Sequence, residues 1–227
     1  MLFLVLGRGR TGSLVAQVAY ERGHSVRVVG EEENRDAAAL TAPFLAGFDA
    51  VIDFTTPEAA VQNIRACLAN GARVVVGTTG WYDHLSDMRA LCERRGAALL
   101  YSTNFSVGVQ ALFRLARELA GALPGYRFSI TETHHAAKKD VHSGTALSLQ
   151  HIIEGATRGV TVPIESKREG EVPGIHVVEA RSDNDSLFLK HEAHSRLGFA
   201  EGAVRAAEWI AGKTGCWDFQ EIAGRLG

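Results

Sequence analysis

The segment Glu132–Thr145 brings imidazole, ammonium and hydroxyl groups together in one short stretch of the chain. An imidazole titrates near neutrality, so it can donate or stabilise a proton under physiological conditions. A lysine ammonium supplies a point charge and, where it is desolvated, an acid. Because the segment lies directly ahead of an apolar helical pattern, we interpret it as a candidate reaction site.

The end of this segment is suited to an anion. Ser143-Gly144-Thr145 leads into a helical pattern that runs from Ala146 to about Glu154. The first N–H groups of a helix have no partner within the helix, and the helix dipole favours negative charge beside them. With two hydroxyls next to those N–H groups, the turn is expected to bind a carboxylate or a phosphate.

A second candidate site lies near the N-terminus. The apolar run Leu2–Leu6 predicts a strand, and a helical pattern begins at Leu14. A strand, a glycine turn and a helix in this order are typical of a dinucleotide site: the glycines permit a tight turn, the approach of a pyrophosphate and close packing of helix on strand. The residues of the turn are Gly7, Arg8, Gly9, Arg10, Thr11 and Gly12.

Acidic residues follow the second predicted strand, Ser25–Val29. Glu31 and Glu32 lie about twenty residues beyond the glycine turn, where an acid would bind the hydroxyls of the adenosine ribose. We assign this role to Glu31 or Glu32, and a solvated turn is the alternative interpretation of the charged run. Arg35 is close but does not directly follow the acids, so NADH is favoured over NADPH.

Strand and helix patterns alternate through the first half of the chain, which is typical of an α/β fold with a doubly wound parallel sheet of Rossmann type. Further strands are predicted at Ala50–Phe54, Arg73–Val76 and Ala97–Tyr101. In such open sheets the ligand binds in loops at the carboxyl ends of strands. Two loops of this kind supply further candidate cofactor contacts: Gly77, Thr78, Thr79, Ser102, Thr103, Asn104 and Phe105.

The pattern changes near Asn104. A long helix and four strands follow, which indicates a smaller α+β domain with a mixed or antiparallel sheet. The predicted ranges are 108–123 for the helix and 126–133, 160–164, 174–181 and 186–193 for the strands, with terminal helices at 199–211 and 219–226. We therefore expect a dinucleotide-binding domain of residues 1–103 and 198–227, and a substrate-binding and oligomerisation domain of residues 104–197.

Composition narrows the class of protein. The chain has 227 residues, 46% of them hydrophobic, which is enough for a core in one large or two small domains. Its net charge is -2 and its basic residues are scattered, so no nucleic-acid partner is expected. The N-terminal apolar run is too short for a membrane span or a signal peptide, and no cysteine pair has CxxC spacing. These features predict a cytoplasmic protein with no membrane partner.

Several motifs along the chain occur together in a known family. They are Gly7–Gly12, Val51–Thr55, Gly77–Gly80, Asn104–Val109, Glu132–Thr145, Ser195-Arg196 and Phe199–Arg205. Over nearly its whole length the chain resembles 4-hydroxy-tetrahydrodipicolinate reductase, formerly called dihydrodipicolinate reductase, of the diaminopimelate route to lysine. The Glu132–Thr145 signature is the most specific of these motifs, and the glycine turn is the least specific.

The resemblance implies an NAD(P)H-dependent reductase, usually a homotetramer, that acts on a small cyclic dicarboxylate. It places the family's proton donor/acceptor on His134 and its proton donor on Lys138. It also implies that the nicotinamide end of the cofactor lies along the loops at 77–79 and 102–105. The implied substrate contacts are His135, Gly144 and Thr145, with Ser143 as a helper.

The central signature departs from the family pattern in two places. His142 stands where a proline usually precedes Ser-Gly-Thr, and Ala136-Ala137 stand where basic or imidazole residues are often found. Neither change removes a named catalytic group. Since proline fixes the backbone and a basic residue aids capture of a dianion, we expect loop rigidity and substrate affinity to be affected.

Other interpretations of the same residues stay open. His134 and His135 could ligate a metal with His142 and His151, but the absence of tight Cys/His or HExxH spacing argues for no metal. The chain could also be another NAD(P)-dependent dehydrogenase that acts on an amino or imino acid. A third alternative is a non-catalytic dinucleotide sensor, which would have no use for a proton donor such as Lys138.

Overall fold

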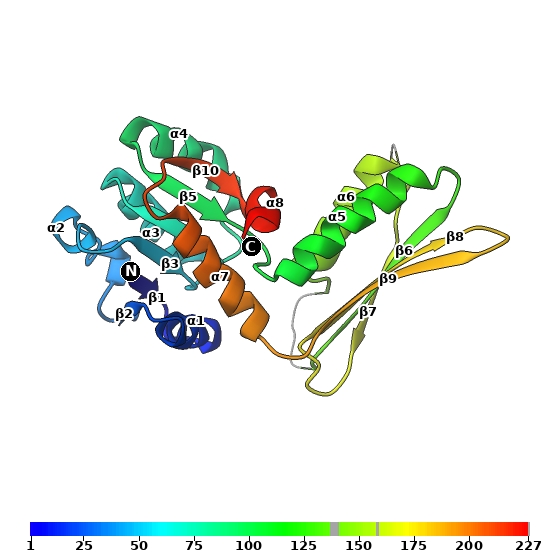
Figure 1. Cartoon of the computed structure of the whole chain (residues 1–227), viewed down its shortest axis with the longest axis horizontal. Helices are drawn as coiled ribbons and strands as arrows, with labels where there is room; N and C mark the ends of the chain where they lie inside the picture. The colour runs from blue at the N-terminus through cyan, green and yellow to red at the C-terminus, as the bar shows by residue number, and fades with distance from the viewer. Residues whose placement is uncertain (137–140, 158, 227) are drawn as a thin grey trace. The chain divides into compact units, whose positions relative to one another are not determined.

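The chain folds into two compact units, and the computed structural model describes residues 1–136, 141–157 and 159–226 (Figure 1). Unit 1 comprises Met1–Ser106 and Leu197–Gly227, and unit 2 comprises Val107–Arg196. The predicted boundaries between the two domains follow residues 103 and 197, and the boundaries between the two units follow Ser106 and Arg196. Within the described ranges, no helix has the length and apolar character needed to cross a membrane.

Unit 1 is built on a six-stranded parallel sheet. The sheet order turns back between the first and third strands, and an open sheet binds its ligand at such a switch point. This arrangement confirms the predicted Rossmann-type fold class. In sheet order the strands are β10 (Gly215–Asp218), β5 (Ala98–Tyr101), β4 (Arg73–Val76), β3 (Ala50–Asp53), β1 (Leu2–Leu6) and β2 (Ser25–Val29).

Helices cover both faces of this sheet, so its inner strands read as continuous apolar runs (Figure 1). Helices α1 (Arg10–Glu21) and α7 (Leu197–Ile210) pack on one face, and α3 (Pro57–Ala69) and α4 (Leu85–Arg95) pack on the other. Shorter helices are α2 (Ala42–Leu45) and α8 (Phe219–Ile222), with 3₁₀ turns at Arg35–Ala37, Tyr82–His84 and Ala223–Arg225.

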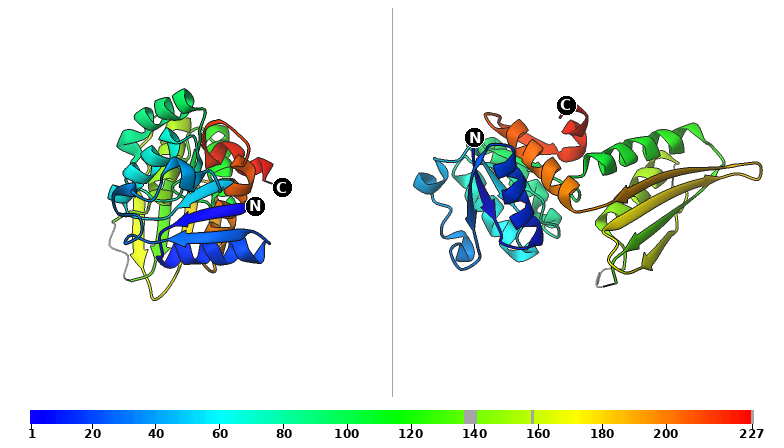
Figure 2. Two further views of the ribbon diagram at one scale, coloured as in Figure 1. Left: turned by 90° about the vertical axis from the view of Figure 1, so that its left-hand side faces the viewer. Right: turned by 60° about the horizontal axis from the view of Figure 1, so that its bottom comes forward.

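Unit 2 is a four-stranded mixed sheet with two helices packed on one face (Figure 2). In sheet order its strands are β7 (Ile164–Arg168), β6 (Arg127–His134), β8 (Gly174–Arg181) and β9 (Ser186–Ala193), and only the β6–β7 pair is parallel. The helices are α5 (Val107–Ala122) and α6 (Gly144–Ala156). Alternate residues of β6 and β8, such as Ile130 and Val178, form the core with Phe113 and Leu149 because strand side chains alternate between faces. The predicted α+β character is confirmed.

The prediction and the structure differ most clearly at three places. The predicted strand Val160–Ile164 is wrong: β7 begins only at Ile164, because Pro163 has no N–H to donate to a ladder. The short edge strand β10 was not predicted. The first helix begins at Arg10 rather than near Leu14, since its first turn is polar and carries no apolar pattern.

Candidate active site

A cavity of about 510 Å³ opens at the carboxyl ends of β1, β2 and β3. Its wall includes Gly7, Arg8 and Gly9 from the glycine turn, and Glu31 beyond β2. Arg35, which the sequence analysis considered as a phosphate partner, also lines it. The cavity therefore lies at the switch point of the sheet, where this fold binds nucleotides.

The backbone of the turn accounts for its glycines. Gly7 has a φ of 101°, a conformation that L side chains rarely adopt, and a Cβ at Gly12 would lie 2.1 Å from the Gly7 carbonyl oxygen. Gly9 precedes α1 without a side chain to cap it, so the first N–H groups of the helix can meet a phosphate. Arg10, Thr11 and Gly12 form the first turn of α1 and are not part of the cavity wall.

The candidate ribose acids separate in the structure. Both Glu31 and Glu32 are exposed, but only Glu31 lines the cavity. Glu33 instead pairs with the Arg8 guanidinium and accepts a hydrogen bond from the Gly30 N–H at 3.1 Å. Arg8 is thereby held against an acid at the cavity edge, and Arg35 lines the cavity beside it.

Asp53 ends β3 with a fully buried carboxyl group that the sequence analysis did not single out. It accepts hydrogen bonds from the N–H and hydroxyl of Thr55 at 3.0 and 2.7 Å, from the Thr78 hydroxyl at 2.8 Å and from Asn63 Nδ2 at 2.8 Å. Burial raises the pKa of Asp53 above its usual value, against the opposing effect of these donors. The network joins the loops after β3 and β4 to α3.

The two predicted loops beyond β4 and β5 lie at the same edge of the sheet, outside the wall of the cavity. Thr78 is buried on Asp53, while Thr79 and Thr103 are exposed. A Cβ at Gly77 would lie 2.1 Å from the Phe54 ring, so any larger residue there would have to displace that ring. Further contacts fix the second loop: the Ser102 hydroxyl donates to the Asn104 carbonyl at 2.8 Å, and Phe105 packs in the core.

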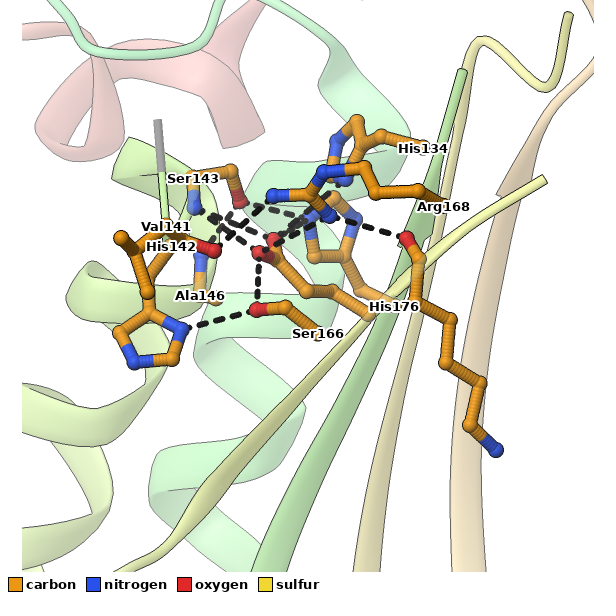
Figure 3. Close-up of polar contacts among 10 residues, drawn as sticks. His134, Val141, His142, Ser143, Ala146, Ser166, Arg168 and His176 are labelled. Carbon is orange, nitrogen blue, oxygen red and sulfur yellow. Dashed lines mark hydrogen bonds and ion pairs between the residues drawn. The ribbon is translucent and has the colours of Figure 1, made fainter. Parts of the chain in front are cut away.

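In unit 2, Glu132 is the centre of a polar network (Figure 3). Its carboxylate is fully buried on β6 and accepts from the Ser143 N–H at 3.0 and 3.2 Å and from the Ser166 hydroxyl at 2.8 Å. His176 Nε2 and His134 Nδ1 lie 3.6 and 3.5 Å from Oε2. Burial opposes ionisation, yet the interactions with His176, Ser143 and Ser166 hold the pKa of Glu132 well below its usual range.

Ser143 caps helix α6, and its backbone and side chain are both held in place. Its hydroxyl accepts from the Ala146 N–H at 3.1 Å and lies 3.1 Å from His176 Nε2, while its own N–H goes to Glu132. Gly144, which is exposed, and Thr145, which is buried, form the first turn of the helix. The predicted anion-binding turn is thus a helix N-terminus fixed to the sheet beneath it.

The two histidines of the predicted pair differ in position. His134 is buried at the end of β6, with its ring centroid 5.1 Å from that of His176. His135 is half-buried, and its Nε2 lies 3.4 Å from the guanidinium of Arg196. The predicted proton donor Lys138 lies outside the described residues.

His142 is anchored to β7. Its Nδ1 lies 2.8 Å from the Ser166 hydroxyl, which in turn donates to Glu132. Arg168 donates from Nη2 to the Val141 carbonyl at 2.9 Å. Side-chain contacts with β7 therefore hold positions 141 and 142, where the family pattern usually has a proline that fixes the backbone.

Glu132, His134 and His176 offer ligand atoms within 4.8 Å of one another. Two histidines and a carboxylate are a possible zinc set. In this structure, however, the carboxylate already accepts from Ser143 and Ser166, and His176 Nε2 faces the Ser143 hydroxyl. We interpret the three residues as part of a hydrogen-bonded network.

The sequence analysis missed the buried groups that hold these loops, although two of them left a signal. Asp53 is a charged residue in an otherwise apolar strand, and Glu132 stands two residues before His134. A buried ionisable residue needs partners, so each marks a point where polar groups must converge. His176 and Ser166 left no such signal, because they come from strands far away in the sequence.

Comparison with known proteins relates both units to the same family. Family models described as the N-terminus and the C-terminus of dihydrodipicolinate reductase match residues 1–105 and 108–222. The chain belongs to the dihydrodipicolinate reductase family. It is accordingly an NAD(P)H-dependent oxidoreductase.

Individual members of the dihydrodipicolinate reductase family match over nearly their full length. A 4-hydroxy-tetrahydrodipicolinate reductase of Christiangramia forsetii is 36% identical and covers 100% of this chain and 99% of its own. One from Natronomonas pharaonis is 37% identical over 94% of this chain and 96% of its own. The solved structure of a dipicolinate-bound dihydrodipicolinate reductase from Paenisporosarcina sp. TG-14 has a TM-score of 0.79 and 21% identity, and the alignment covers 98% and 99% of the two chains.

Proposed function

We propose that this protein reduces 4-hydroxy-tetrahydrodipicolinate to tetrahydrodipicolinate with NAD(P)H, in the biosynthesis of diaminopimelate and lysine. The main support is the anion-binding turn of unit 2, which Glu132 anchors through the Ser143 N–H at 3.0 Å. A ring with two carboxylates is the class of ligand that such a helix N-terminus suits. The solved relative in its dipicolinate complex supports a substrate of the same class.

We assign the substrate contacts and the proton chemistry to unit 2. Gly144 and Thr145 supply the N-terminal turn of α6, Ser143 assists, and His135 contributes beside Arg196. His134 serves as proton donor/acceptor and Lys138 as proton donor, so that charge developing on the ring is neutralised. When bound, the nicotinamide cofactor supplies the hydride.

We assign the cofactor to unit 1, with its phosphates at the glycine turn and its nicotinamide end along the loops at 77–79 and 102–105. Glu31 is the ribose-binding acid of choice, because it lines the cavity and Glu32 does not. We propose that NADH is preferred over NADPH, since the Glu31 carboxylate would repel a 2′-phosphate and the Arg8 guanidinium is paired with Glu33. The ratio of kcat/KM for the two cofactors tests the preference, and Glu31→Ala should move it toward NADPH.

A coupled assay tests the reaction itself. The product of the preceding pathway enzyme is supplied to the protein, and the absorbance of NADH or NADPH is followed. Loss of absorbance that depends on both the protein and this substrate is the expected result. Turnover with aspartate or a simple imino acid, and none with this substrate, would instead favour the amino-acid dehydrogenase alternative. Cofactor binding without turnover of either kind would favour the sensor.

We also propose a homotetramer located in the cytoplasm. The face of the unit 2 sheet away from α5 and α6 carries Phe188, which is 62% exposed, and the half-buried side chains of Ile175 and Val177. Apolar side chains on a sheet face that neither helix covers are suited to contact between subunits. Light scattering after size exclusion should give the tetramer mass for the wild type and a smaller species for Phe188→Asp. The cysteines are free thiols, which fits a reducing compartment.

A further inference from the structure

The Ser143 hydroxyl has a hydrogen-bonding capacity that can be counted. A serine oxygen accepts two hydrogen bonds and donates one. One acceptor position is filled by the Ala146 N–H at 3.1 Å. The other close partner is His176 Nε2, also at 3.1 Å, and this contact can run in either direction. Which ring nitrogen of His176 carries the proton therefore decides whether the Ser143 hydroxyl can donate its own proton to a ligand.

Two observations place the His176 proton on Nε2. First, Nε2 lies 3.6 Å from the Glu132 carboxylate, and a nearby negative charge favours the proton on the ring nitrogen that is closer to it. Second, Nδ1 of His176 is buried and has no hydrogen-bond partner among the described residues. A proton on Nδ1 would leave an unpaired donor in the interior, which is costly. The Nε2–H form avoids this cost.

With the proton on Nε2, His176 donates to the Ser143 oxygen. Both acceptor positions of that oxygen are then occupied, by Ala146 and by His176. The hydroxyl proton of Ser143 must point away from both. It then has a fixed direction at the N-terminal turn of α6, where a substrate carboxylate would compete for it with the Glu132 carboxylate, which also interacts with the Ser143 side chain.

We propose that His176, held by Glu132, is a positioning residue that fixes the Ser143 hydroxyl as a hydrogen-bond donor to a substrate carboxylate. The proposal rests on the proposed function, and it adds a specific device to the anion-binding turn. Register explains why the device is rigid: Glu132 and His176 are directly opposed on β6 and β8, and Ser166 opposes Glu132 on β7. Three neighbouring strands thus fix one hydroxyl proton.

Dipicolinate, a stable planar dicarboxylate, is the probe for a test by isothermal titration. Ser143→Ala should weaken its binding by about 10-fold, since a hydrogen bond to a charged group is lost. His176→Leu should weaken binding by a similar factor. The double variant should be no weaker than either single variant, because the two residues act as one unit.

A matched pair at position 176 separates positioning from packing. Gln can present an N–H near the place of Nε2, so His176→Gln should bind dipicolinate within about threefold of the wild type. Asn has a similar amide that ends one carbon short, and His176→Asn should lose about 10-fold. The affinity for NADH, which we assign to unit 1, should be unchanged in all variants. The Gln and Asn variants therefore test the positioning role even if His176→Leu does not fold.

The outcomes are distinct. Wild-type binding of dipicolinate with equal affinities in the Gln and Asn variants would overturn the positioning role and leave the proposed function intact. Losses that multiply in the Ser143→Ala, His176→Asn double variant would also overturn it. A wild type that reduces the substrate but does not bind dipicolinate would contradict the role of the turn. A wild type that neither binds dipicolinate nor reduces the substrate would contradict both the proposed function and this inference.

Discussion

Asp53 in unit 1 and Glu132 in unit 2 are both fully buried carboxyl groups on strands, and both accept hydrogen bonds from other segments of their unit. Their pKa values nevertheless shift in opposite directions, upward for Asp53 and downward for Glu132. The hydrogen bonds to Asp53 come from neutral groups, the hydroxyls and N–H of threonines and an amide. Glu132 additionally faces two imidazoles and, at 4.0 Å, the guanidinium of Arg168.

The difference shows that the number of hydrogen bonds does not by itself decide the charge of a buried carboxyl group. At Asp53 the loss of hydration outweighs the hydrogen bonds, whereas at Glu132 the hydrogen bonds from His176, Ser143 and Ser166 outweigh it. We infer that Asp53 serves mainly to hold the β3 and β4 loops. Glu132 is an anion at neutral pH, and its charge also orients the groups around it.

The largest effect is expected from Lys138→Ala. It should lower turnover by orders of magnitude, because the proton donor is lost. The affinity for NADH should stay nearly unchanged, since we assign that site to unit 1. Single-turnover kinetics and NADH titration measure the two quantities, with Lys139→Ala as the matched control. A parallel loss of NADH affinity would contradict the assignment of the two ligands to different units.

The next largest effect separates the two carboxyl groups. Glu132→Ala leaves the Ser143 N–H and the Ser166 hydroxyl without their acceptor, so dipicolinate binding should weaken by about 100-fold and NADH binding should not. Asp53→Ala should weaken NADH binding and leave dipicolinate binding unchanged, because the loop at Thr55 loses its hydrogen-bond partner. Titration of both variants with both ligands checks this, and equal losses for both ligands would show a general loss of structure instead.

The pH dependence of stability should differ in sign between the two carboxyl groups. The pKa of Glu132 is lowered, so its contribution is present above the usual value of 4.5 and is lost as the pH falls. The pKa of Asp53 is raised, so its contribution is complete below the usual value of 3.8 and is lost as the pH rises through the folded value. Relative to the wild type, Glu132→Gln should gain stability on acidification and Asp53→Asn on neutralisation. Urea unfolding at a series of pH values measures both, and slopes of the same sign would contradict the comparison.

The smallest effect is expected at His142. Replacement by Ala removes one hydrogen bond to Ser166, at the edge of the Glu132 network, so the KM for the substrate should rise by no more than about threefold. His151→Ala, at an exposed position on α6, is the control and should have no effect. A loss at position 142 as large as that of Glu132→Ala would mean that His142 contacts the substrate directly.

The sequence predicted the fold class because periodicity is a local property that the sheet preserves. The bounds of β2, β4, β8 and β9 agree with the predicted strands. The edge strand β10 could not be predicted, since Gly215–Asp218 has no alternation and forms only by pairing with β5. At Val160–Ile164 apolar character suggested a strand, but the strand begins only at Ile164 because Pro163 has no N–H to donate.

The residues of the candidate site also fall into those that the sequence could predict and those that it could not. Gly7, Gly9 and the turn at Ser143 could be found because their function depends on backbone geometry written in consecutive residues. The residues that hold the Ser143 turn in place belong to other strands, as His176 and Ser166 do, and the Asp53 carboxylate is held in the same way by Asn63 of α3. Strand pairing brings them together, and a single sequence carries no local signal for it.

The central claim is that the Glu132-anchored turn of unit 2 binds a dicarboxylate, independently of a nucleotide site in unit 1. Calorimetric titration of Glu132→Ala with dipicolinate and then with NADH tests it most directly. The account predicts that dipicolinate affinity falls by about 100-fold while NADH affinity stays at the wild-type value. Unchanged dipicolinate affinity in a folded variant that still binds NADH would contradict it.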